Sequence, residues 1–451
     1  MFKYNINILF LCIFIPQVII AKIFPLIIPI THNDIIQKNT INHIQNYYPT
    51  INDPLLNFYL KNLGDYLIGC SKNPYINNIQ YLLINSSNIN AFATSTNIIA
   101  INTGLIKQSV SEGELAGVIA HEIAHITQKH SQRLKEKMQY ANIASYVGLL
   151  GASIMGMLSR DPNNINAPII TGQALSIHKI NSHQREYEHE ADRIGAQIIN
   201  NSRYSTREMA NQFSRLNKQT GYYNYFEENQ SHPVASKRYA DALYRVSSIK
   251  KKKSLLRDSE FQLIKTYIQF KEKDIYKLLN SHFGKILLLI LENKISLATK
   301  KIRDMYKENP NSFIISYIYI KLLIISKEYD KALIIINETN NLFENNYPIM
   351  ILHSKIYILN NQYVDAKRLL KEISLAHPKA PDAFYLYSKV AFKTNKPILG
   401  HMMMGYYFFN ISQIQSSIEQ FKIALQKIKK SDHRYDSLYN IYDRLVKTAK
   451  K

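Results

Sequence analysis

The sequence has 451 residues, of which 46% are hydrophobic, and this length and composition favour a globular protein of two domains over a disordered chain. Its formal net charge is +22, but no basic segment is interleaved with aromatic residues and no zinc-finger spacing occurs, so we expect no nucleic-acid partner. A general drift of the composition toward Lys and Asn accounts for the charge, and peripheral association with an anionic membrane surface is compatible with it.

The first 21 residues have the layout of a secretory signal peptide. Lys3 precedes an apolar run from Ile8 to Ile20, and Ala21 offers a cleavage position. The run is too short to span a bilayer comfortably. The bulky Ile19, two residues before the cut, leaves an uncleaved anchor as the alternative. We expect an exported, periplasmic chain with a signal peptide at residues 1–21.

The remainder of the chain divides into two parts of different texture. Residues 22–248 mix strand-like and helical segments, and the stretches NIQYLLINSS (78–87) and NIIAINTGLI (97–106) are typical of short apolar strands. Four consecutive lysines, 250–253, mark a solvated linker that we place at 249–262. Residues 263–451 are almost purely helical in pattern.

The helical part carries an internal repeat. Small residues recur at a spacing of 34 positions, at Ala298, Ala332, Ala366 and Gly400. This is the period of tetratricopeptide repeats, in which a small residue lets the two helices of a pair approach closely. Stacked pairs form a curved solenoid with a concave binding surface. A non-repetitive helical bundle is the alternative.

The stretch GVIAHEIAHITQKH (117–130) contains an H-E-x-x-H motif in an apolar helical pattern. On a helix, His121 and His125 project from one face and can bind one Zn²⁺ ion. Glu122 would accept a proton from the water on that ion. Ser111, followed three residues later by Glu114, predicts the start of this helix.

A second helical segment, HQREYEHEADRIGAQII (183–199), offers a third ligand. Glu188 could complete the metal site, and Asp192, one turn later on the same face, could orient a ligand imidazole. Glu190 competes for the ligand role but points to another side of the helix. A charged, solvent-facing helix is the alternative. Four further histidines have no matching partners in the sequence, and we assign them no role: His130, His178, His183 and His189.

The residues His121-Glu122-Ile123-Ala124-His125, followed by Glu188-His189-Glu190-Ala191-Asp192, resemble the membrane-associated zinc peptidase family that includes HtpX and the CAAX prenyl endopeptidases. With the signal peptide and the repeats, the full chain resembles the periplasmic members of that family. The resemblance implies an α+β zincin-like metallopeptidase domain, mostly helical with a small sheet, followed by an all-α tetratricopeptide-repeat solenoid. It further implies one Zn²⁺ held by His121, His125 and Glu188, with Glu122 as the general base.

Two further features follow from the resemblance alone. In SHPVASKR (231–238), His232 matches a histidine that can occupy the remaining zinc position in a resting state, although a histidine that simply precedes Pro233 at a helix start is the alternative. The segment Asn90-Ala91-Phe92-Ala93 matches an edge strand that pairs with an extended substrate. The family's glycine turn after it is replaced here by Ser95-Thr96-Asn97, which leaves the strand geometry open.

The implied function is zinc-dependent endopeptidase activity, with chaperone activity, in the assembly and quality control of outer-membrane β-barrel proteins. The implied substrates are misassembled barrel proteins, and the implied partner of the repeats is the barrel assembly machinery. The alternative is a non-catalytic periplasmic chaperone or scaffold with a structural or permanently closed zinc site. Glu122 argues against that alternative, because a structural site has no need of this carboxylate.

Overall fold

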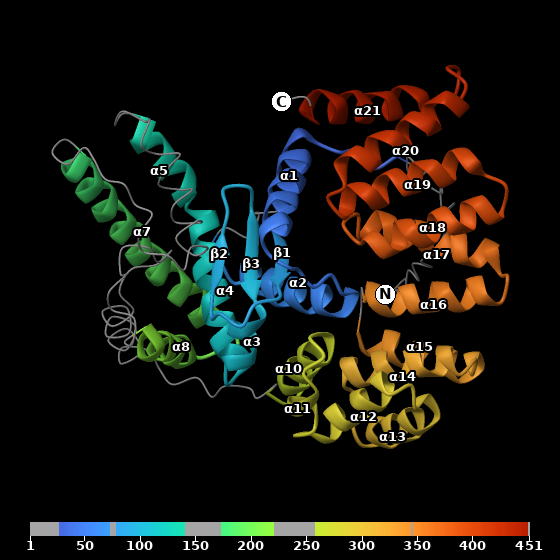
Figure 1. The fold of residues 1–451 in the computed structure, drawn as a ribbon, viewed down its shortest axis with the longest axis horizontal. Coiled ribbons are helices and arrows are strands. Elements are labelled where there is room, and N and C mark those ends of the chain that lie inside the picture. The colour runs from blue at the N-terminus through green and yellow to red at the C-terminus, as the bar shows by residue number, and fades with distance from the viewer. Residues whose placement is uncertain (1–26, 73–77, 140–172, 221–257, 344–345, 450–451) are drawn as a thin grey trace, which may run out of the picture.

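The computed structural model describes residues 27–72, 78–139, 173–220, 258–343 and 346–449. Residues 1–21, the expected signal peptide, lie outside the described residues, as does the lysine run at 250–253. The N-terminal half combines helices with a small sheet, and the C-terminal half is all helical (Figure 1). The expected fold class is confirmed.

The N-terminal half holds helices on both sides of three short strands. Its elements are α1 (His32–Tyr47), α2 (Pro54–Gly69), β1 (Gln80–Ile84), β2 (Ala91–Ala93), β3 (Ile98–Asn102), α3 (Thr103–Gln108), α4 (Glu112–Thr127), α5 (His130–Gln139), α7 (Gln173–Asn201) and α8 (Thr206–Thr220).

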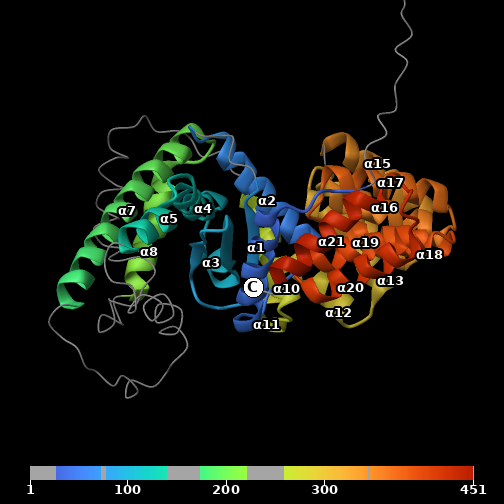
Figure 2. The ribbon, with the colours of Figure 1, turned by 90° about the horizontal axis from the view of Figure 1, so that it is seen from above.

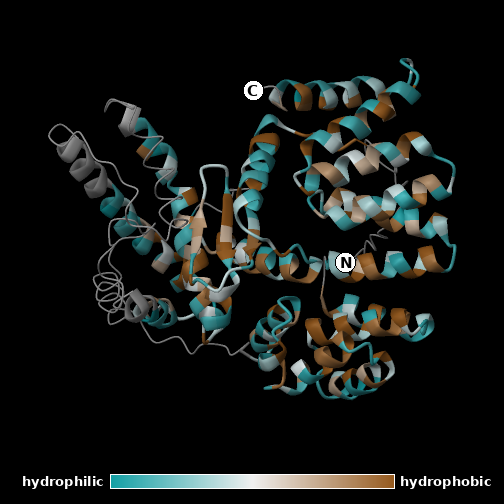
Figure 3. Ribbon diagram, viewed as in Figure 1, coloured by the Kyte–Doolittle hydropathy of each residue, from teal (hydrophilic) through white to brown (hydrophobic). Residues whose placement is uncertain are grey.

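The sheet has the strand order β1-β3-β2, with β1 parallel and β2 antiparallel to the central strand. All five residues of β3 are buried, and the strand is apolar along most of its length (Figure 3). Ile99 and Ile101 join the hydrophobic cluster that contains α2 and α4, whereas Ala100 packs with Ile44 of α1 on the opposite face. Coverage on both faces explains why this strand reads as a continuous apolar run.

The turn between β2 and β3 forms without glycine. Asn97 adopts a left-handed conformation with φ 59°, which asparagine tolerates better than most residues. The Gln37 side chain of α1 donates hydrogen bonds to the carbonyl groups of Thr96 and Asn97, at 2.8 and 3.2 Å. The Ser95-Thr96-Asn97 replacement is therefore compatible with a paired β2.

Helix α4 begins where the sequence predicts. The Ser111 hydroxyl accepts a hydrogen bond from the backbone N–H of Glu114 at 3.3 Å. The Glu114 carboxylate in turn accepts one from the backbone N–H of Val110 at 2.7 Å. These bonds satisfy donors at the start of a helix whose residues are almost all buried.

The C-terminal half is a stack of antiparallel helix pairs (Figure 1). Its elements are α10 (Asp258–Lys271), α11 (Ile275–Leu278), α12 (His282–Leu291), α13 (Ile295–Glu308), α14 (Phe313–Ile325), α15 (Tyr329–Leu342), α16 (Tyr347–Leu359), α17 (Tyr363–Ala376), α18 (Pro381–Lys393), α19 (Pro397–Asn410), α20 (Ile414–Lys427) and α21 (Tyr435–Ala449).

Two independent features of these pairs share the 34-residue period. The recurring alanines are fully buried in the second helix of each pair: Ala298, Ala332 and Ala366. The turn inside each pair has one residue with φ between 52° and 60°, and these residues are Asn293, Lys327, Asn361 and Asn395. The period matches tetratricopeptide repeats.

The first and last helices of the C-terminal half both pack into it. Helix α10 begins at Asp258, inside the range 249–262 expected for the linker, and its Phe261 is fully buried. The amphipathic helix α20 is followed by α21, which buries Leu438 and Leu445. Amphipathicity marks a helix with one packed face, and α21 has the same property.

Within the N-terminal half, helices α1 and α2 lie on the side that faces the repeat helices (Figure 2). The Tyr406 hydroxyl of α19 donates a hydrogen bond to the carbonyl oxygen of Ile28 and accepts one from its N–H, both at 2.9 Å. The Tyr267 hydroxyl of α10 donates to the carboxylate of Asp53, which caps α2, at 3.1 Å. The N-terminal residues therefore dock the repeat helices against the half that carries the sheet.

Candidate metal centre

Helices α4 and α7 pack closely and bring the two candidate motifs together. A Cβ atom added at Gly195 of α7 would lie 3.2 Å from both Cα and N of His121. The absence of a side chain at Gly195 therefore allows α7 to approach the backbone of α4. His121 and Glu188, which face each other across this contact, are 2% and 7% exposed.

Three side chains converge on one point. The Nε2 atoms of His121 and His125 lie 3.0 Å apart. Glu188 places Oε2 3.3 Å from His121 Nε2 and Oε1 3.4 Å from His125 Nε2. Among the described residues this is the group of His, Cys, Asp and Glu side chains arranged to hold a metal ion.

The protonation of His121 follows from its second partner. Asp192 Oδ1 lies 2.9 Å from His121 Nδ1. Because an ionised carboxylate only accepts hydrogen bonds, Nδ1 carries the proton and Nε2 presents a lone pair to His125 and Glu188. Sequence spacing places Asp192 in this position, one turn after Glu188.

The donor set fits a tetrahedral zinc ion. Ligand atoms at about 2.0–2.1 Å from such an ion are separated by about 3.3 Å, which is close to the three separations observed. Nitrogen lone pairs and carboxylate oxygens that face one another in a buried site repel unless a cation lies between them. Two imidazoles and a carboxylate are also the ligand types that zinc prefers.

Glu122 lies beside the first ligand on α4 and is 1% exposed. A carboxylate in a buried site next to a metal ion can exchange a proton with a water molecule there.

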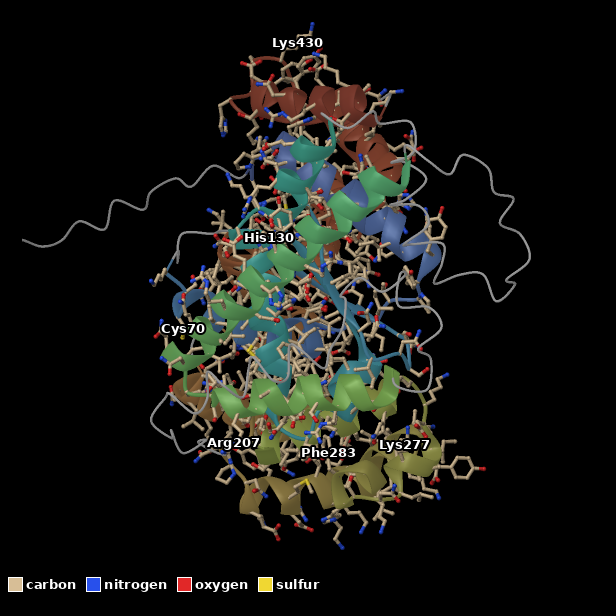
Figure 4. The ribbon with its side chains drawn as sticks, turned by 90° about the vertical axis from the view of Figure 1, so that its left-hand side faces the viewer. Cys70, His130, Arg207, Lys277, Phe283 and Lys430 are labelled. Carbon is tan, nitrogen blue, oxygen red and sulfur yellow. The ribbon has the colours of Figure 1, made fainter. Side chains whose placement is uncertain are left out.

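His130, to which the sequence assigns no role, contacts one of the candidate metal-binding side chains (His130 is labelled in Figure 4). Its Nδ1 lies 3.0 Å from Nδ1 of His125, and its Nε2 lies 3.1 Å from Oε2 of Glu190. Arg133 donates a hydrogen bond to the same Glu190 oxygen at 2.9 Å. Glu190 therefore faces away from the three metal-binding side chains, as its position on α7 predicts.

The sequence does not reveal His130 because the chain turns sharply before it. In a continuous helix, a residue five positions after His125 would point about 140° away from it. Helix α4 ends at Thr127, and Lys129 adopts a left-handed conformation with φ 53°, so that α5 starts in a new direction at His130. The signal was a histidine shortly after the motif, which spacing alone could not place.

The electrostatics of this cluster favour a neutral imidazole beside an ionised carboxylate. Burial lowers the pKa of His130, and the hydrogen bond to Glu190 offsets this only in part. Partial burial tends to raise the pKa of Glu190, but the hydrogen bonds from Arg133 and His130 outweigh it, so that this pKa is lowered.

Strand β2 forms an edge of the sheet and contacts α4. The N–H of Thr94 donates to the Ile98 carbonyl, and the N–H of Asn102 donates to the Asn90 carbonyl, both at 2.9 Å. Because hydrogen-bonded pairs alternate along an antiparallel ladder, the N–H and C=O groups of Ala91 and Ala93 point away from β3. These groups therefore take no part in the ladder between β2 and β3.

His232 lies outside the described residues, together with the rest of SHPVASKR. Within the described part of the chain, no helix combines the length and the apolar character needed to cross a membrane.

Residues 54–246 match the model of peptidase family M48. The Beta-barrel assembly-enhancing protease of Yersinia pestis is 34% identical over 203 residues, which are 45% of this chain and 41% of that protein. The protein of the same name from Escherichia coli (strain K12) is 32% identical over 214 residues, 47% of this chain and 43% of that protein. Protease HtpX of Legionella pneumophila (strain Lens) is 33% identical over 173 residues, 34% of this chain and 57% of that protein.

This chain thus spans less than half the length of the two assembly-enhancing proteases that it matches. A solved tetratricopeptide-repeat domain aligns with 72% of this chain and 99% of its own, at 13% identity and a TM-score of 0.15. A TM-score this low carries no argument, so the repeat architecture rests on the helix pairs and their period.

Proposed function

We propose that this chain, which carries a peptidase family M48 domain at residues 54–246, is a zinc-dependent endopeptidase. The observation that carries the proposal is the convergence of His121, His125 and Glu188 within hydrogen-bond distance of one another, with lone pairs facing a common point. Glu122 in the same helix supplies the carboxylate that peptide hydrolysis needs.

In the proposed reaction the three side chains hold the ion, and Asp192 keeps the His121 ring in the binding orientation. When bound, the ion would polarise the scissile carbonyl group and lower the pKa of a water molecule. Glu122 accepts a proton from the water molecule as the water oxygen attacks the carbonyl carbon. Glu122 then delivers that proton to the amide nitrogen as the C–N bond breaks.

The substrate in this proposal is an extended polypeptide. The outward N–H and C=O groups of Ala91 and Ala93 support it, because edge-strand pairing recognises a backbone rather than particular side chains. The names of the matched relatives link a protease to β-barrel assembly, which supports β-barrel proteins as the proposed substrate class. We propose that the enzyme acts in the periplasm on misassembled barrel proteins, and that its repeats bind the assembly machinery and contribute chaperone activity.

The role of His232 stays a proposal that rests on the resemblance. A fourth ligand at the ion would displace the attacking water and silence the site. Such control would suit a protease that meets many unfolded chains.

The alternative is a scaffold in which zinc is structural. The test is to measure bound zinc and the cleavage of casein and of an unfolded barrel protein by wild type and Glu122→Gln. We expect equal zinc content, with cleavage by the variant reduced at least about 10²-fold because its general base is lost. Glu136→Gln, an exposed change on α5, is the matched control and should cleave as wild type does. Equal cleavage by wild type and Glu122→Gln would overturn the protease proposal, and zinc binding without cleavage in either would favour the scaffold.

A further inference from the structure

The two candidate metal-binding histidines are supported in different ways. His121 donates its Nδ1 proton directly to the carboxylate of Asp192. His125 instead meets the Nδ1 atom of a second imidazole, that of His130, at 3.0 Å. Two imidazole nitrogens at this distance share one proton, because two protonated nitrogens would repel and two lone pairs would form no bond.

The position of that proton follows from the far side of His130. Its Nε2 contacts Glu190 Oε2 at 3.1 Å, and this oxygen also accepts a hydrogen bond from Arg133. The carboxylate can only accept, so Nε2 of His130 carries a proton and its Nδ1, in the neutral ring, presents a lone pair. The shared proton therefore lies on Nδ1 of His125, and Nε2 of His125 presents its lone pair to Glu188 and His121.

We propose that His130 is a positioning residue that, backed by Glu190, fixes the tautomer and orientation in which His125 binds the metal ion. The inference rests on the proposed zinc site and names a residue outside the H-E-x-x-H motif. A hydrogen bond to the free nitrogen of a ligand histidine sets its tautomer and raises its basicity. Here the acceptor is the neutral imidazole of His130, which in turn donates its own N–H to the carboxylate of Glu190.

The surroundings hold His130 in a single orientation. The residue is 3% exposed, and its ring stacks on Tyr187 of α7 with a centroid separation of 4.8 Å and an interplanar angle of 16°. The Arg133 guanidinium lies 4.7 Å from the same Tyr187 ring while it binds Glu190. We call the chain of contacts His125–His130–Glu190 the relay. His130 and Arg133, which binds Glu190, each have a second contact with Tyr187 that restricts their rotation.

A histidine suits this position electrostatically. Glu122, Glu188 and Asp192 already place three carboxylates in or beside the buried site, and a divalent ion would balance two negative charges. A further carboxylate in direct contact with His125 would add to the unbalanced negative charge in a region of low dielectric. With His130 as a spacer, the charge of Glu190 lies farther from the ion and is paired with Arg133.

The test is the zinc affinity of variants, measured by competition with a chelator. His130→Phe keeps an aromatic ring on Tyr187 but removes the acceptor, and we expect zinc binding about 10–100-fold weaker than in wild type. His130→Gln restores an acceptor oxygen and should recover part of this loss. The matched control is His43→Phe, because His43 is an exposed histidine of α1 whose ring lies 5.0 Å from that of Tyr47, and this variant should leave the affinity unchanged.

A second readout separates this inference from the zinc site itself. Imidazole ¹⁵N shifts of the metal-free protein should show His125 protonated at Nδ1 in wild type and a mixture of tautomers in His130→Phe. Glu190→Leu, at a side chain that is 28% exposed, should leave the tautomer of His130 less fixed and weaken zinc binding less than His130→Phe does.

Unchanged zinc affinity and an unchanged His125 tautomer in His130→Phe would overturn the inference. If wild type bound no zinc, the proposed function would fail, while the ¹⁵N shifts would still decide whether the relay exists. If His130→Phe did not fold, Glu190→Leu would carry the test, and wild-type affinity and tautomers in that variant would count against the relay.

Discussion

Asp192 Oδ1 accepts a hydrogen bond from His121 Nδ1 at 2.9 Å, and both side chains are buried. Removing the acceptor leaves a buried imidazole N–H without its bond and frees the ring to adopt the other tautomer. We expect Asp192→Ala to bind zinc about 10–100-fold more weakly than wild type in a chelator competition. Asp192→Asn keeps an acceptor oxygen and should lose less; equal losses in the two variants would argue against hydrogen bonding as the cause.

Helical periodicity sufficed to bring four residues of the site together. His121 and His125 are one turn apart on α4, and Glu188 and Asp192 are one turn apart on α7. Each pair needs only an unbroken helix to share a face. The sequence did not predict the place of His130, because that place depends on a left-handed turn at Lys129. A lysine at such a turn is not a recognisable signal in the sequence, as a glycine would be.

The fold was predictable to a similar limit. The apolar runs around β1 and β3 and the 34-residue period are local patterns, and they identified β1, β3 and the helix pairs. The run 97–106 extends past β3, however, and its residues 103–106 form the start of α3 instead of continuing the strand. The docking of the N-terminal residues on the repeats depends on contacts between residues far apart in sequence, such as Ile28 with Tyr406. No local pattern encodes such a contact, so the sequence did not predict that the N-terminal residues pack against the repeats.

A substitution at Gly195 should change the zinc affinity without changing the thermal stability. In Gly195→Ala, the new Cβ would meet the His121 backbone at 3.2 Å and force α7 away from α4 by a few tenths of an ångström. The higher helix propensity of alanine, about 1 kcal/mol, offsets the strain. We expect little change in Tm but a several-fold loss of zinc affinity, because Glu188 moves away from the histidines.

The matched control for this change is Gly69→Ala. Gly69 ends α2, and a Cβ there would meet no atom within 4 Å. Its zinc affinity should equal that of wild type. If Gly195→Ala also binds zinc normally, the approach of α7 to α4 does not set the ligand geometry.

Lys38 predicts a pH dependence at the junction between the halves. Its side chain is 5% exposed, and its Nζ donates to Gln80 Oε1 at 3.3 Å and to the Asn410 carbonyl at 2.9 Å. Burial, and then repulsion from Lys379, lowers the pKa of Lys38 from 10.5 to about 7. Between these two values the unfolded chain binds a proton at this residue that the folded chain does not, so stability should rise with pH from about 7 to 10.5.

Lys38→Met removes this dependence. The gain in stability of the variant over wild type should be largest at pH 6, where it should be a few kcal/mol, as expected from the size of the pKa shift of Lys38. This advantage should decrease progressively toward pH 10. The acceptors left on Gln80 and Asn410 lower the gain by an amount that does not vary with pH. Thermal unfolding across this range measures the difference, with the exposed Lys300→Met as control. If the difference in stability between variant and wild type stays constant with pH, the pKa of Lys38 is not lowered in the folded protein.

The edge strand β2 predicts how the substrate backbone is held. Because the N–H of Ala93 points away from β3, Ala93→Pro removes one donor for an added strand without breaking the ladder to β3. The loss of one main-chain hydrogen bond, about 0.5–1.5 kcal/mol, should raise KM for an unfolded protein substrate about 2–10-fold. Zinc content should not change, since β2 contributes none of the three metal-binding side chains. Ala93→Ser keeps the N–H and is the matched control. If Ala93→Pro leaves KM at the wild-type value while Ala93→Ser also behaves as wild type, substrates bind elsewhere than along this edge.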